Sequence, residues 1–212
     1  SKMLGGFVLT LRTMTGCPVT QHMHNLQNWK LSTMTFSHFL ETAQKQQRHP
    51  LTHAGSTDIL YYHLNTRLPQ LLLHDVVLPT YVPCFTKPGF HTVTSFTMGF
   101  GRQVHPLHSH LDDVLLYQVA GYQTVTLIPP DTPSAYLYES LQVSKLEKLS
   151  PLNAENLDFD TYPLARHLNP IEVVLRPGDS IYIPALWWRQ ASFSCRHLVV
   201  IFSFDMRGGR QL

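Results

Sequence analysis

Residues 103–118, QVHPLHSHLDDVLLYQ, hold three histidines and two aspartates just before an apolar run, and these side chains could do chemistry. Residues two apart on a β-strand point to the same face, so His108 and His110 are expected to lie side by side. Imidazole suits both zinc and nickel, and two such side chains on one face could hold a metal. Whether they do depends on a third ligand.

Residues 176–193, RPGDSIYIPALWWRQASF, are the other informative stretch. Pro-Gly-Asp between two apolar runs predicts a tight turn, and SIYIP predicts a strand that leads to paired tryptophans. Similar short runs, rich in β-branched and aromatic residues and closed by Gly or Pro, predict strands along the C-terminal two-thirds. These runs cover residues 91–100, 113–121, 122–130, 171–184 and 197–204.

The N-terminal part of the chain predicts a strand, a turn at residues 16–20 into another strand, and two helices. The first strand covers residues 5–11, and the first helix covers residues 32–47, with Ser32 or Thr35 as its cap. The second helical stretch covers residues 56–73 and ends at prolines. We therefore expect helices first and a β-barrel or sandwich after them.

Together these segments resemble the JmjC-type cupins, the double-stranded β-helix hydroxylases that use iron and 2-oxoglutarate. The resemblance covers nearly the whole chain and keeps the family's motifs in order and spacing. Among members, the hydroxylase of tRNA wybutosine synthesis and the asparaginyl hydroxylase of hypoxia-inducible factor look nearest. The matching segments are PLHSHLDDVLLYQVAGYQTVTLIPP (106–130), PPDTPSAYLY (129–138), AENLDFDTYP (154–163) and PGDSIYIPALWWR (177–189).

The resemblance implies the fold class, an all-β core with N-terminal helices (α+β) wound as a double-stranded β-helix, the JmjC/cupin jelly roll. It implies a single domain over residues 1–212. Within it, residues 1–80 form an N-terminal helical and strand segment, and residues 81–212 form the double-stranded β-helix core.

The resemblance also assigns the metal positions. The family holds its metal with two histidines and one carboxylate, a facial triad that leaves open positions. Carried over residue by residue, His108 matches the first ligand and His110 stands at the carboxylate position. Arg189 stands at the position of the distal histidine.

Three positions of the family's 2-oxoglutarate site also differ. Gln123 stands where the family has the lysine that pairs with the cosubstrate carboxylate. His105 stands at the polar position three residues before the first ligand, and Val114 at the asparagine six residues after it. Loss of the lysine removes a charge-assisted bond worth about 1.5–3 kcal/mol.

Arg189 is the decisive departure. An arginine is effectively never deprotonated in proteins, so it has no lone pair to give a metal. Its charge would also repel Fe²⁺ in a weakly screened cavity. Iron and 2-oxoglutarate, which the resemblance implies, are therefore expected to bind weakly or not at all.

Three arrangements remain open for these residues. His108 and His110 with Asp112 or a water could hold zinc or nickel, if a bulge brings Asp112 close. Alternatively, Arg189 with His105, His108 and Gln123 could form a donor-rich pocket for a carboxylate or phosphate. In the third arrangement Arg189 pairs with Asp112 or Asp113 and the cavity is filled.

Trp187 and Trp188 precede Arg189 and are expected to pack in and around the barrel mouth rather than stack on a base.

Two functions follow from these hypotheses. The preferred one is a divergent, non-catalytic JmjC protein with a degenerate metal and 2-oxoglutarate site, which acts as a binding or structural component. The alternative is an active 2-oxoglutarate-dependent oxygenase with non-standard ligation that hydroxylates a protein side chain or tRNA base. The resemblance allows a protein or RNA partner, and Arg189 separates the two functions.

Composition narrows the setting. The 212 residues carry 16 Lys and Arg against 14 Asp and Glu, a net charge of +2, so there is no bulk signature of nucleic-acid binding. Three widely spaced cysteines without a CxxC pair indicate neither a disulfide framework nor a zinc ribbon, but reduced thiols in an intracellular protein. No apolar run is long enough to span a membrane, so no membrane partner is expected.

Overall fold

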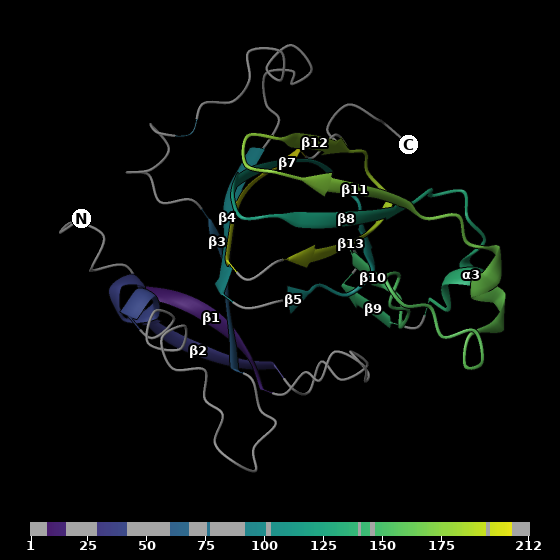
Figure 1. Ribbon diagram of the computed structural model, residues 1–212, viewed down its shortest axis with the longest axis horizontal. Coiled ribbons are helices and arrows are strands. Elements are labelled where there is room, and N and C mark those ends of the chain that lie inside the picture. Colours follow the sequence, from purple (N-terminus) through teal and green to yellow (C-terminus); the bar gives the residue numbers. More distant parts are fainter. Residues whose placement is uncertain are drawn as a thin grey trace.

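The computed structural model describes most of the chain from residue 92 onward and four shorter stretches before it. Within these ranges the chain is folded mostly into antiparallel strands (Figure 1). No helix among the described residues is both long and apolar enough to cross a bilayer. The described ranges are residues 8–15, 29–41, 60–67, 76, 92–100, 103–139, 141–144, 147–193 and 196–204.

The described strands form two sheets of seven strands each. The order in the first sheet is β12 (Ser180–Ile183), β7 (Asp113–Ala120), β14 (Arg196–Phe204), β4 (Thr92–Phe100), β3 (Leu60–Arg67), β1 (Val8–Thr15) and β2 (Trp29–Thr35). The second sheet has the order β11 (Ile171–Leu175), β8 (Gln123–Ile128), β13 (Trp188–Phe193), β6 (His108–His110), β10 (Glu147–Leu149) and β9 (Leu141–Ser144), with β5 (Gln103–Val104) also paired to β13.

Successive strands of the C-terminal half alternate between the two sheets. β7 lies in the first sheet and β8 in the second, and the strands from β11 to β14 again switch sheet at each step. This winding is that of a double-stranded β-helix, so the predicted fold class is confirmed. The space between the sheets holds apolar side chains, because alternate residues of each strand face inward. These interior residues, the barrel core, are Val114, Leu116, Val125, Leu127, Leu175, Ile183, Phe193 and Val199.

The described residues of the 131–170 segment extend the second sheet through β9 and β10 and cover its outer face with their apolar side chains. They contain a short helix, α3 (Ser134–Leu137), the strands β9 and β10, and a 3-10 helix, η2 (Pro163–His167). The buried Gln190 of β13 attaches this segment with two hydrogen bonds. Its Oε1 accepts from the Ala154 amide at 2.9 Å, and its Nε2 donates to Asn153 Oδ1 at 2.8 Å.

The N-terminal expectations are partly wrong. Residues 29–35 form β2, so the first helix begins only at residue 36 and is described to residue 41. Thr35 caps it as expected, since the His38 amide donates to Thr35 Oγ1 at 3.3 Å. Phe39 of this helix is fully buried against the outer face of the first sheet.

The second expected helix is wrong over residues 60–67, which form β3. This strand pairs with β1 on one side and β4 on the other, and ladders on both sides override a weak local helical pattern. The rest of the two expected helices, 42–47, 56–59 and 68–73, lies outside the described residues.

Two turns between strands require left-handed backbone. Gly121, between β7 and β8, has φ +75°, and Gly178, in the predicted Pro-Gly-Asp turn between β11 and β12, has φ +96°. The Asp179 carboxylate closes the second turn, because its Oδ2 accepts from the Arg176 amide at 2.8 Å. The two glycines differ in surroundings: a Cβ at Gly121 would overlap the Arg196 carbonyl oxygen, whereas Gly178 has nothing within 4 Å.

The pair gives a matched test of the fold. Gly178→Ala should lower the free energy of unfolding by about 1–2 kcal/mol, the conformational cost alone. Gly121→Ala should cost roughly twice that or more, because the β14 backbone must also move. Urea unfolding of both variants measures the difference, and equal losses would contradict this placement of the β7–β8 turn.

Candidate functional site

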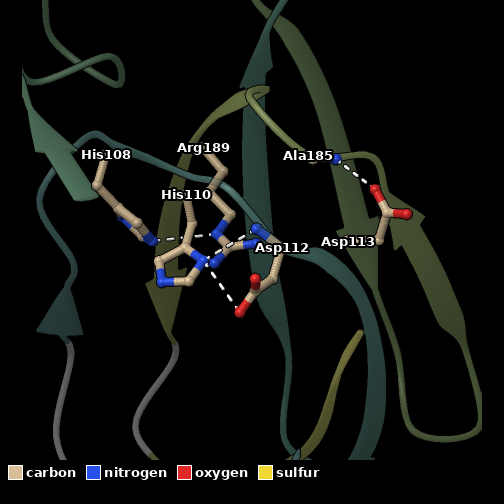
Figure 2. Close-up of polar contacts among 6 residues, drawn as sticks. All are labelled: His108, His110, Asp112, Asp113, Ala185 and Arg189. Atoms are coloured by element: carbon tan, nitrogen blue, oxygen red, sulfur yellow. Dashed lines mark hydrogen bonds and ion pairs between the residues drawn. The ribbon is translucent and has the colours of Figure 1, made fainter. Parts of the chain in front are cut away.

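His108 and Arg189 lie directly opposite each other on the neighbouring strands β6 and β13. Their side chains meet: Arg189 Nε donates a hydrogen bond to His108 Nε2 at 3.0 Å (Figure 2). The imidazole nitrogen at the family's first metal-ligand position therefore already accepts a hydrogen bond from a guanidinium.

The second ring nitrogen of His108 fixes its protonation state. Nδ1 lies 2.9 Å from the carbonyl oxygen of Pro106, which can only accept, so Nδ1 carries the proton and Nε2 carries the lone pair. Burial, followed by the Arg189 charge, lowers the pKa of His108 from 6.5 to about 3. His108 is therefore neutral, as an acceptor for Arg189 must be.

His110 is turned toward Asp112, which follows it in the bend between β6 and β7. The Asp112 amide donates to His110 Nδ1 at 3.1 Å, and Asp112 Oδ2 lies 3.5 Å from the same nitrogen. The bend, rather than a bulge in a strand, brings Asp112 to His110. Because Nδ1 accepts a hydrogen bond from the amide, the neutral ring carries its proton on Nε2. The Nε2 atom of His110 therefore has no free lone pair.

Asp113 is separate from this group (Figure 2). Its Oδ1 accepts a hydrogen bond from the Ala185 amide at 2.6 Å. Burial of the Tyr182 phenol, followed by the hydrogen bond of this phenol to Asp113, raises the pKa of Tyr182 to about 12. The next amide along this loop, that of Leu186, donates to the His110 carbonyl oxygen at 2.8 Å. The loop that leads to Arg189 is thus tied to the β6–β7 bend.

Gln123, at the family's lysine position, lies away from Arg189. Gln123 is buried and pairs across the sheet with Phe193 and Leu175 of the barrel core. It lies four residues along β8 from Leu127, the residue that pairs with Arg189. Four residues of strand span about 13 Å. The Gln123 side-chain nitrogen has no hydrogen-bond partner among the described residues. Val114 is fully packed in the barrel core.

His105 lies between the two ends of the barrel, since it is close enough to both His108 and His197 to lower the pKa of each, and its amide donates to the Ala191 carbonyl oxygen at 2.7 Å. Its ring meets Phe193 edge to face at 4.8 Å, and Phe193 stacks on His197 at 3.9 Å. Burial, followed by the nearby His105, lowers the pKa of His197 from 6.5 to about 3. Pattern reasoning did not single out His197, because its neighbours in sequence form an ordinary apolar strand.

The residues present do not fit iron and 2-oxoglutarate. Arg189 has no lone pair, and the facing lone pair of His108 accepts from it. Val114 and Gln123 offer no charge to a dicarboxylate, and apolar side chains fill the space between Gln123 and Arg189. The described residues contain no group of three or more His, Cys, Asp or Glu side chains placed to hold a metal ion.

The structure separates the arrangements that the sequence left open. The donor-rich pocket is not assembled in full, because Gln123 lies opposite Phe193, four residues along β8 from the partner of Arg189, while Arg189 contacts His108. The zinc or nickel site stays a prediction. Among the described side chains, no group of three donors is placed to hold such a metal. The third arrangement, with Arg189 paired to Asp112 or Asp113 in a filled cavity, stays a prediction; the barrel core is packed, Asp113 Oδ1 accepts from the Ala185 amide, and Arg189 Nε donates to His108.

Both tryptophans pack against apolar side chains, but Trp188 does so outside the barrel rather than at its mouth as expected. Trp187 is packed against the barrel core, whereas Trp188 is buried beneath the 131–170 segment. The side chains around Trp188 are Leu107, Ile128, Leu137, Leu152, Ala165 and Leu168.

Comparison with known proteins places this site in a family context. A family model described as a cupin-like domain matches residues 12–210. Lysine-specific demethylase JMJ30 of Arabidopsis thaliana is 27% identical over 178 residues, 82% of this chain and 39% of that protein. Jumonji C domain-containing protein 5 of Drosophila melanogaster is 30% identical over 60% of this chain and 31% of its own length. tRNA wybutosine-synthesizing protein 5 of Gallus gallus is 33% identical over 56% of this chain and 34% of its own length. The matched region therefore spans well under half the length of each of these three relatives.

The two neutral histidines predict an acid-sensitive fold. Because the folded-state pKa values of His108 and His197 lie below 6.5, the unfolded chain binds more protons between pH 6.5 and about 3. Stability is therefore full above about pH 6.5 and falls as the pH drops; His197 alone should account for about 2 kcal/mol at pH 5. Urea unfolding near pH 7.5 and near pH 5 measures the loss.

The variant His197→Gln should show a smaller loss between these two pH values, whereas His38→Gln, at an exposed position, should behave like the wild type. An unchanged pH dependence in His197→Gln would contradict the burial of a neutral imidazole at this position.

Proposed function

The chain belongs to the cupin-like domain family of the JmjC type, and on that premise we propose that it is a non-catalytic binding or structural component. In this proposal the metal and 2-oxoglutarate site is degenerate. The family's members generally use Fe(II) and 2-oxoglutarate, and this chain retains their β-helix without their chemistry.

One observation carries the proposal: Arg189 Nε lies 3.0 Å from His108 Nε2. A metal at the family position would need that lone pair and would lie beside a permanent positive charge. The packed barrel core supports the proposal independently, because a dicarboxylate would have to displace Val114, Leu116 and Leu127.

The partner in this proposal is a protein or an RNA inside the cell. The names of two relatives refer to lysine demethylation and to tRNA wybutosine synthesis, that is, to work on protein and on RNA. A net charge of +2 favours neither by bulk attraction.

Metal and cosubstrate assays test the proposal directly. Protein purified without a histidine tag should contain no stoichiometric iron and should form no succinate from 2-oxoglutarate when Fe(II) and oxygen are supplied. Stoichiometric iron together with succinate formation would overturn the proposal and favour an oxygenase with non-standard ligation.

Restoring the family residues tests the cause. The variant His110→Asp/Arg189→His replaces a cation by a lone-pair donor and should gain close to one equivalent of Fe(II) in metal analysis. Adding Gln123→Lys should not bring succinate formation, because the apolar core still fills the cosubstrate volume. Failure of the double variant to gain metal would mean that Arg189 is not what excludes it.

A further inference from the structure

We infer that the Arg189 guanidinium is an internal, permanent substitute for a metal ion, holding β6 against β13. The inference rests on the proposed function in one respect, that His108 does not bind a metal. It goes further by giving Arg189 a positive role, which mere loss of a ligand does not supply.

β6 needs such support because its backbone pairing with β13 is short. Only two residue pairs join them, Ser109 with Trp188 and His108 with Arg189. β5 likewise pairs with β13 through two residues, and the His105 amide donates to the Ala191 carbonyl oxygen of β13 at 2.7 Å, but the next residue, Pro106, has no amide hydrogen to donate. The edge from 103 to 110 is therefore an interrupted strand.

The His108 ring bridges this interruption. Its Nδ1–H donates to the Pro106 carbonyl oxygen at 2.9 Å, within the break, and its Nε2 accepts from Arg189 Nε at 3.0 Å, across to β13. Two hydrogen bonds in series thus connect Pro106 to His108 and His108 to Arg189. In the family's arrangement, a metal bound to the histidine at position 108 would take the same lone pair and would likewise join this ring to the ligand at position 189.

β6 in turn carries the 131–170 segment. Its other edge pairs with β10 through Glu147, Lys148 and Leu149, and the Ser150 amide donates to the Leu107 carbonyl oxygen at 2.9 Å. Loosening β6 should therefore loosen β10 as well, while β14, held between β4 and β7 by long ladders, should not respond.

Hydrogen exchange of the full chain in EDTA tests this role. Arg189→Met keeps the aliphatic stem and removes every donor, so amide protection in β6 and β10 should fall about tenfold, with β14 unchanged. Lys148→Met is the matched control, since it removes a cation from β10 whose ion pair with Glu139 is partly exposed. Protection in Arg189→Met equal to that of Lys148→Met would overturn the inference.

A second variant separates a cross-link from general destabilisation. Arg189→His loses the guanidinium but faces His108 with a second imidazole, so Ni²⁺ alone should restore the protection of β6 and β10. Ni²⁺ should leave the wild type unchanged. No recovery in Arg189→His, or an equal response of the wild type, would overturn the inference. Iron-dependent succinate formation by the wild type would instead refute the proposed function, so the two failures can be told apart.

Discussion

The hydrogen bond from Arg189 to His108 is the constraint on which the rest of the site depends. It needs a neutral imidazole with its proton on Nδ1, and the Pro106 carbonyl and the low pKa of His108 both supply that state. Once formed, it takes the lone pair with which the family binds its metal. In the proposal made above, the same contact keeps a metal out and joins the strands that a metal would join.

The scaffold and the site have diverged to different degrees. The alternating strands, the Pro-Gly-Asp turn and the apolar interior are those of a double-stranded β-helix. The differences from the family are single side chains, among them Arg189 and Gln123, which stand four residues apart along the ladder of β8 and β13. A barrel held by its ladders and core tolerates such changes, because its stability does not depend on catalytic groups.

The sequence predicted the strands of the C-terminal half because each combines alternating apolar residues with a Gly or Pro stop. It failed for residues 60–67, where pairing with β1 and β4 decides the outcome and no local signal reports it. It identified Arg189 as the departure from the family but not its partner. That partner depends on a strand register and a histidine tautomer, and neither is visible in residue spacing.

The most direct measurement is the long-range ¹H–¹⁵N NMR spectrum of the histidine side chains, with and without one equivalent of Co²⁺. The account predicts that His108 is neutral near pH 7, protonated on Nδ1 and unprotonated on Nε2, and that Co²⁺ leaves its signals in place. Signals of His108 that broaden or shift with Co²⁺, or a ring protonated on Nε2, would contradict the claim that the guanidinium holds this lone pair.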